Sequence, residues 1–180
     1  MKKCIAPLLF LTAFYLFAQN HSNEVKLPDG TSFLLGKISR DALQTAPYAQ
    51  WMERNYTAYT VDGSLVNLFK ASLNSTELLL FLGTWCGDSK REVPRVLKIL
   101  DTANFPNDKL TLIALDKRKE SYKKSPGGEE KGWNITRVPT LILLQDGKEV
   151  NRIVERPVSS WEEDLQTILS GASYVPNYAN

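Results

Sequence analysis

The sequence is poor in the side chains that most often carry catalysis or bind metals: its 180 residues include two cysteines and one histidine. The histidine, His21, lies in a polar stretch near the N-terminus, which argues against a Cys-His or Ser-His-Asp nucleophile. So few ligands also argue against a zinc site, and we expect no metal ion and no cofactor. Cys4 lies near the start of the chain, so Cys86 is the one cysteine in the remainder. That part of the chain must therefore be stabilised by a hydrophobic core, without an internal disulfide.

The chain also lacks an excess of charge of one sign. It has 22 basic and 20 acidic residues, and the first 18 residues hold two of the lysines and no acidic residue. This balance gives no electrostatic basis for binding nucleic acid. The densest basic run, residues 117–119 followed by Lys123 and Lys124, is interrupted by Glu120. We interpret it as a solvated loop, with a partner-docking patch as the alternative.

Long apolar runs are lacking except near the start, where residues 5–17 follow two lysines and precede Ala18 and a polar stretch. This pattern is typical of a cleaved secretory signal, so residues 1–18 are predicted to be a signal peptide and the mature protein to be periplasmic or secreted. The apolar run is shorter than the roughly 20 residues that cross a membrane. We therefore expect no stable membrane span after cleavage, with an uncleaved anchor as the alternative.

The chain before residue 76 predicts short elements. Residues 25–38 have the pattern of an irregular strand or hairpin that turns at Asp29-Gly30. Pro47 is placed to open a helix, and apolar spacing predicts a second helix that ends near Leu73.

The pattern is sharper from residue 77 onward. Residues 78–82 are wholly apolar and end at Gly83, which is typical of a strand buried on both faces. The apolar positions that follow lie on one helix face, so Cys86 is predicted at or just before a helix N-terminus. A second strand is predicted over residues 110–115, parallel to the first.

The C-terminal third predicts a hairpin and a last helix. Residues 140–144 and 149–154 flank Asp146-Gly147, a strong hairpin signal. Ser160 and Glu163 have capping-box spacing before an apolar helix that Gly171 can end.

One segment carries chemistry. Residues 84–90 read Thr-Trp-Cys-Gly-Asp-Ser-Lys, which is a Cys-x-x-Cys redox motif with Ser89 in place of the second cysteine. Cys86 can therefore form a disulfide only with another molecule. Unpaired N–H groups and the helix dipole favour its thiolate, whereas Asp88 opposes the thiolate and Lys90 and Arg91 partly offset Asp88.

Together these elements resemble the thioredoxin fold over residues 76–170. The resemblance rests on Trp85-Cys86-Gly87 at a strand end, Pro94 within the following helix, and Val138-Pro139-Thr140 before the hairpin. It implies an α/β, three-layer fold with a central mixed sheet flanked by helices and an N-terminal helical extension. The domain boundaries predicted on this basis are 19–75 for the extension, 76–171 for the thioredoxin-like domain and 172–180 for a C-terminal tail.

The resemblance also implies residue roles. Cys86 is the expected nucleophile, and Ser89 can donate a hydrogen bond to its sulfur. Pro94 is expected to bend its helix and Pro139 to be cis and to face the cysteine. The expected substrate-binding residues are Trp85, Gly87, Asp88, Val138 and Pro139. The chain departs from the family where thioredoxins carry a buried acidic residue, because that position is Leu80.

Several functions stay open at this point. The first is monothiol thiol-disulfide exchange through Cys86, as a mixed-disulfide reductase or isomerase acting on an exported protein or on a small-molecule thiol or disulfide. The second is a non-catalytic binding module that keeps the thioredoxin fold. A glutaredoxin-like glutathione or iron–sulfur site is suggested by Cys-Gly-x-Ser, although Asp88 and the predicted export count against it. A peroxidase would need a threonine farther upstream than Thr84.

Overall fold

The computed structural model describes residues 24–179, so the predicted signal peptide, Cys4 and His21 lie outside the described residues. Within this part of the chain the elements follow in the order β1 (Glu24–Lys26), β2 (Ser32–Leu34), β3 (Gly36–Ile38), α1 (Ala49–Ala58), α2 (Gly63–Asn74), β4 (Glu77–Leu82), α3 (Gly87–Thr102), β5 (Leu110–Ala114), β6 (Thr140–Gln145), β7 (Lys148–Val154) and α4 (Trp161–Leu169). Short 3-10 turns cover Asp41–Gln44, Asn107–Lys109 and Lys119–Ser121. No helix among the described residues is long and apolar enough to span a membrane.

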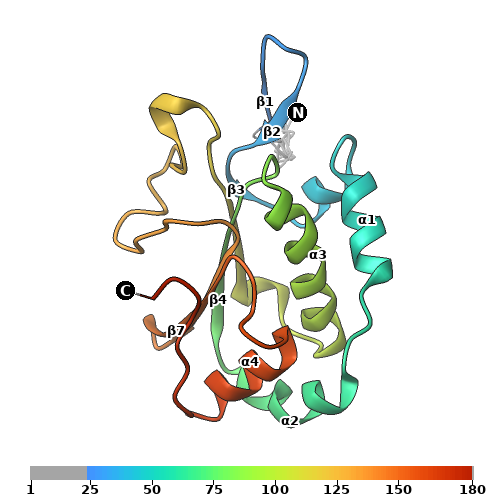
Figure 1. The fold of residues 1–180 in the computed structure, drawn as a ribbon, viewed down its shortest axis with the longest axis vertical. Coiled ribbons are helices and arrows are strands. Elements are labelled where there is room, and N and C mark those ends of the chain that lie inside the picture. The colour runs from blue at the N-terminus through green and yellow to red at the C-terminus, as the bar shows by residue number, and fades with distance from the viewer. Residues whose placement is uncertain (1–23, 180) are drawn as a thin grey trace, which may run out of the picture.

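A mixed sheet forms the centre of the molecule, with strand order β3-β5-β4-β6-β7 (Figure 1). β4 runs parallel to β5, as predicted, and pairs antiparallel with β6 on its other side. β6 and β7 form the predicted hairpin, in which Asp146 and Gly147 both adopt positive φ angles. The five-stranded sheet and the helices confirm the mixed α/β, thioredoxin-like fold class.

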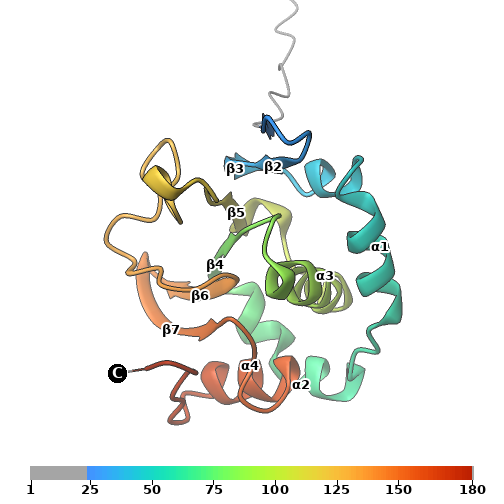
Figure 2. The ribbon, with the colours of Figure 1, turned by 45° about the horizontal axis from the view of Figure 1, so that its top comes forward.

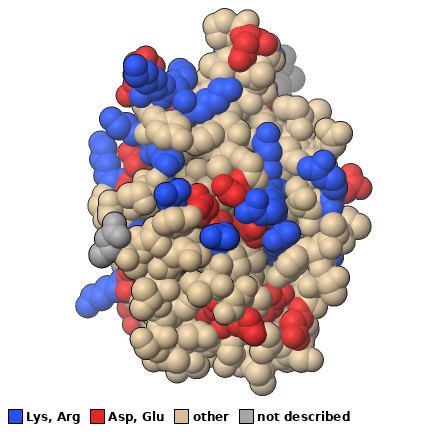
Figure 3. Space-filling model, viewed as in Figure 1, with Lys and Arg blue, Asp and Glu red and all other residues tan. Residues whose placement is uncertain are grey.

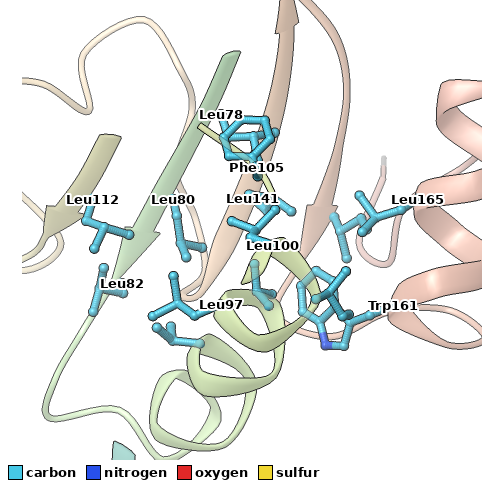
Figure 4. Close-up of a cluster of buried hydrophobic side chains, with 14 of the residues drawn as sticks. Leu78, Leu80, Leu82, Leu97, Leu100, Phe105, Leu112, Leu141, Trp161 and Leu165 are labelled. Carbon is cyan, nitrogen blue, oxygen red and sulfur yellow. The ribbon is translucent and has the colours of Figure 1, made fainter. Parts of the chain in front are cut away.

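Alternation along the central strands divides the core between the two faces of the sheet. Leu78, Leu80 and Leu82 of β4 belong to the larger cluster, where they face side chains of α3 and α4 (Figure 4). Buried apolar side chains of α1 and α2 belong to the same cluster. Phe81 belongs to a smaller cluster on the opposite face, completed by Ile113, Leu115, Val138, Ile142 and Leu144. We call these two sides the helix face and the open face.

The open face is covered by the connection between β5 and β6, which contains no α-helix (Figure 2). Trp85, Cys86, Trp133 and Ile135 pack against the smaller cluster there. The layers are therefore helices, sheet and an irregular connection, and the motif cysteine lies where the connection meets the sheet.

Residues 36–74 share the sheet and the core with the chain that follows. β3 pairs antiparallel with β5 as an edge strand of the main sheet, while β1 and β2 form a separate hairpin. Trp51 and Met52 of α1 and Phe69 of α2 are buried on the helix face. The boundary at residue 76 stays a prediction, but both segments contribute to one core.

Pro94 lies inside α3, as predicted, and the helix is completed from outside. A proline at this position cannot donate to the carbonyl four residues earlier, which belongs to Lys90. Asn55 of α1 donates its side-chain N–H to that carbonyl at 2.9 Å and also to the Trp51 carbonyl at 3.0 Å. The sequence predicted that Pro94 lies within a helix, but not that Asn55 supplies the missing hydrogen bond. This bond ties α1 to the first turns of α3.

The last helix and the tail close the fold. The Ser160 side chain caps α4 by accepting from the N–H of Glu163, and Gly171 follows the helix with a positive φ angle, as predicted. Beyond it, the Tyr174 hydroxyl donates to Asp164, and Asn151 of β7 donates to the Tyr174 carbonyl. The predicted tail therefore packs against α4 and β7.

Candidate functional site

Cys86 lies at the N-cap position of α3, as predicted. Its backbone is extended, with φ −85° and ψ 131°, and its N–H donates to the Gly83 carbonyl at 2.8 Å. The β4 strand delivers the chain to this point, and the turn over residues 83–86 leads into the helix. The thiol is partly buried and is not in a disulfide. The thiol therefore lies beside the first turn of α3, where the helix leaves N–H groups without a partner of its own.

The sulfur of Cys86 faces the loop before β6. Cys86 Sγ donates to the Val138 carbonyl at 3.3 Å, and the Val138–Pro139 peptide bond is cis. Segments 52 residues apart thus meet at the thiol. The predicted cis geometry of Pro139 is confirmed, and the structure brings together three of the predicted site residues: Cys86, Val138 and Pro139.

Trp85 covers the site from the open face. Its indole N–H donates to the Leu115 carbonyl at 2.8 Å, and its ring contacts Tyr122 with centroids 5.4 Å apart. The indole lies so close to Gly83 that a Cβ there would fall 2.7 Å from a ring carbon. Gly83 is therefore required by close approach, and Trp85 is fixed as one wall beside Cys86.

Ser89 does not hydrogen-bond to the Cys86 sulfur, contrary to the role expected for it. Its side chain is fully buried, and its hydroxyl accepts from the Gly83 N–H at 3.1 Å. Ser89 therefore fastens the start of α3 to the end of β4. The sulfur has the Val138 carbonyl as its partner instead.

The charges on the helix side of the site compensate one another. Asp88 pairs with Arg91 at 2.7 Å, and Arg91 also contacts Glu92 at 2.6 Å. The bond to Glu92, and then that to Asp88, raise the pKa of Arg91 against the effect of its partial burial. The Asp88 carboxylate is thus neutralised by a cation and is not left unpaired beside the motif. Gly87 is exposed at the first position of α3, where a Cβ would meet nothing within 4 Å.

No pattern in the sequence indicated a structural role for Glu92. This carboxylate is 2% exposed and accepts from the Trp161 indole N–H at 2.8 Å, while Arg91 and Arg95 hold its oxygens from outside. It joins α3 to α4 behind the site. The predicted capping box at Ser160 was the nearest indication that α4 begins beside α3.

Two further buried polar residues lie near the site: Thr84, which belongs to the motif but had no predicted structural role, and Asp116, which the sequence did not single out. Thr84 is buried and accepts from the Leu34 N–H at 3.0 Å, which connects β2 to the motif turn. Asp116 is buried at the end of β5 and holds the Arg118 guanidinium and its backbone N–H. Among the described residues no group of three or more histidine, cysteine or acidic side chains could hold a metal ion.

With this geometry in view, the comparison with protein families is decisive. The model of the family described as thioredoxin matches residues 41–166. The chain belongs to the thioredoxin family. The match begins before α1, so the family likeness includes α1 and α2 of the predicted N-terminal extension but not β1, β2 or β3.

Individual relatives agree with this assignment. The chain is 38% identical to a thioredoxin of Chlamydia trachomatis over 77 residues, which are 43% of this chain and 66% of that one. It is 29% identical to a Mycobacterium tuberculosis thioredoxin over 102 residues, 57% of this chain and 79% of that one. A TPR repeat-containing thioredoxin of Arabidopsis thaliana is 26% identical over 98 residues, 53% of this chain, but the chain spans only 23% of that protein.

A solved structure supports the fold alone. A Pseudomonas aeruginosa protein of unknown function, 14% identical, superimposes with a TM-score of 0.51 over 72% of this chain and 87% of that one. This similarity supports the fold of the thioredoxin-like chain and carries no information about its activity.

Proposed function

We propose that this thioredoxin-like protein is exported and exchanges thiols and disulfides through the single thiol of Cys86. The observation that carries the proposal is the 3.3 Å contact of Cys86 Sγ with the Val138 carbonyl beside the cis peptide of Pro139, at the start of α3. It places a partly buried thiol next to backbone groups that an extended substrate can reach. Export is supported only by the pattern of residues 1–18.

The chemical step is a single exchange. The Cys86 thiolate attacks one sulfur of a disulfide, a new sulfur–sulfur bond forms to Cys86, and the other sulfur leaves as a thiolate. Ser89 cannot release the product, because a hydroxyl does not attack a disulfide at neutral pH and this hydroxyl is buried against Gly83. An outside thiol or a second thiol of the substrate must complete the cycle, so no metal or cofactor is required. The expected partners are an exported protein or a small-molecule thiol or disulfide.

The alternative is a binding module without turnover. It is favoured by Leu80, which lies fully buried where thioredoxins carry an acid, and by Ser89 in place of the second cysteine. On this alternative Cys86 is a packing residue against the smaller cluster, and the surface around Pro139 binds a partner. The two proposals differ in the reactivity of the thiol.

The deciding measurement is the pH dependence of alkylation of Cys86 in the protein without residues 1–18. Exchange predicts a thiol that reacts with iodoacetamide at lower pH and faster than free cysteine, and that forms a mixed disulfide with oxidised glutathione visible by mass spectrometry. Cys86→Ala is the matched blank and should fold normally and form no adduct. A slowly reacting thiol that forms no mixed disulfide would favour the binding module.

Ser89→Cys extends the test to turnover. The introduced thiol lies three residues beyond Cys86 at the helix start, so it is expected to displace the bound group from Cys86 and to close an internal disulfide. The adduct should then disappear without added thiol. An adduct as persistent as that of the unmodified protein would show that the helix start does not bring the two sulfurs together.

A further inference from the structure

The connection beside the catalytic thiol carries a concentration of positive charge. Residues 117–124, which we call the basic loop, contain five basic residues and one acidic residue, Glu120. Figure 3 shows Lys and Arg side chains gathered at the upper left, over the segment that Figure 1 draws in yellow. The chain as a whole is nearly neutral, so this charge is local.

The loop is ordered by its own hydrogen bonds. The Asp116 N–H donates to the Lys124 carbonyl and the Lys123 N–H to the Asp116 carbonyl, both at 2.9 Å. The buried Asp116 carboxylate holds Arg118 through its guanidinium at 2.6 Å, and the Lys123 ammonium donates to the Thr136 carbonyl. The loop therefore presents its remaining side chains from a fixed backbone.

Tyr122 connects the loop to the thiol. Its side chain is 49% exposed, and its ring contacts Trp85, the residue before Cys86. The two rings form an aromatic surface that begins at the motif and ends among the lysines. Lys119 and Lys124 flank Tyr122 and, within the part of the chain that the structure describes, their ammonium groups have no hydrogen-bond or ion-pair partner.

The other side of the site does not cancel this charge. Asp88 is paired with Arg91, and Glu92 is buried and held by two arginines. The basic loop, with Glu120 as its one acidic residue, therefore keeps an excess of positive charge. Fixed charges of one sign beside a reactive site raise the rate of encounter with molecules of the opposite sign.

From this arrangement we infer that the substrate of Cys86 is a disulfide carried on an acidic polypeptide segment, which docks on the basic loop and the Trp85–Tyr122 surface. The inference rests on the proposed exchange at Cys86 and names the class of its partner. Lys119 and Lys124 attract the carboxylates, while the two aromatic rings contact the side chains around the disulfide. The composition of residues 117–124 favours a solvated loop, with a partner-docking patch as the alternative, and our inference adopts the alternative.

The test uses three peptides of one length that carry a single cysteine as a mixed disulfide with thionitrobenzoate. Glutamate, glutamine or lysine flanks the cysteine. Attack of Cys86 on the peptide sulfur breaks the peptide–thionitrobenzoate bond, leaves the peptide on Cys86 and releases thionitrobenzoate as a coloured thiolate. The second-order rate constant of this release is measured at low and high salt.

The glutamate peptide is expected to react about 10-fold faster than the lysine peptide at low salt. The two rates should converge near 1 M salt, where the Debye length is only about 3 Å. In Lys119→Glu/Lys124→Glu the preference should vanish or reverse. The matched control is Lys70→Glu/Lys148→Glu, which changes charge equally at exposed lysines on α2 and β7 and should keep the preference.

Binding without reaction separates this inference from the proposed exchange. A fluorescent glutamate peptide with serine in place of cysteine is titrated against Cys86→Ala, and its anisotropy should rise with the unmodified loop and not with Lys119→Glu/Lys124→Glu. Two results would overturn the inference while leaving exchange intact: equal rates for all three peptides, or an equal loss of the preference for the glutamate peptide in Lys70→Glu/Lys148→Glu. Absence of any thionitrobenzoate release with anisotropy retained would overturn exchange but support docking. Absence of the anisotropy change overturns the docking surface.

Discussion

The two faces of the sheet are built differently. The helix face is covered by α1, α2, α3 and α4, whose buried side chains form one large cluster with alternate residues of β4. Figure 4 shows the part of this cluster between β4, α3 and α4. The open face has a much smaller cluster and only the irregular connection between β5 and β6 to cover it. Cys86 and Trp85 pack on the open face. Stability is therefore concentrated on one side of the sheet, and the thiol and its surroundings lie on the other.

The largest effect that tests this comparison comes from two neighbouring leucines of β4. Leu80 is fully buried on the helix face, whereas Leu79 is partly buried on the open face. Leu80→Ala should lower the free energy of unfolding by about 2–5 kcal/mol, because it leaves a cavity among packed helices. Leu79→Ala should cost about 1 kcal/mol, because less apolar area is lost. Chemical denaturation measures both, and equal losses would contradict a division between the faces.

Two tryptophans give a sharper comparison of the same kind. The Trp161 indole donates to the buried Glu92 carboxylate and the Trp85 indole to the Leu115 carbonyl, each at 2.8 Å. Trp161→Phe should cost about 1.5–3 kcal/mol, since a buried charge loses its donor. Trp85→Phe should cost about 0.5–1.5 kcal/mol.

The alkylation rate of Cys86 is a second measurement that separates the two variants. Trp85→Phe is expected to alter the alkylation rate of Cys86, because the indole is the wall beside the thiol. Trp161→Phe should leave that rate unchanged, since it acts behind α3. Denaturation and iodoacetamide kinetics on both variants check this, and a change of the alkylation rate in Trp161→Phe alone would reverse the assignment of the two faces.

The helix face was largely predictable from sequence, because the periodicity of apolar residues and the helix-capping residues are local signals. The apolar spacing of α3, the wholly apolar run of residues 78–82 in β4 and the Ser160 cap each predicted an element that the structure contains. The cis bond before Pro139 came from the family resemblance and not from the residues alone. Pro94 was predicted within α3, but its compensation by Asn55 depends on the packing of α1, which no local pattern shows.

The open face was less predictable because its contacts join residues that are distant in sequence. The composition of residues 117–124 indicated a loop but not that Tyr122 contacts Trp85. Ser89 was expected to serve the sulfur, yet the backbone N–H of Gly83 is its partner. The partner of a buried hydroxyl depends on how the backbone folds around it. Spacing along the sequence alone leaves several possible partners for the Ser89 hydroxyl.

The smallest expected effect concerns Asp116, which orders the basic loop of the open face. Burial alone would raise the pKa of Asp116, but hydrogen bonds from the Arg118 side chain and backbone outweigh it and hold the pKa below its usual value. A carboxyl whose pKa is lowered by folding stabilises the protein above its unfolded pKa, about 3.9, and that contribution is lost as the pH falls through the folded value. Asp116→Asn should therefore cost about 1 kcal/mol at pH 7, because the Arg118 side of the pair is exposed, and progressively less below about pH 4.

The measurement is the difference in unfolding free energy between the unmodified protein and Asp116→Asn as a function of pH. Asp108→Asn, at an exposed position, is the control and should show no such dependence. A difference that stays constant down to pH 3 would mean that the charge of Asp116 does not order the loop. If the difference instead narrows as the pH falls through the folded pKa, the charged pair of Asp116 and Arg118 is what orders the loop that presents Lys119 and Lys124 beside the Trp85–Tyr122 surface.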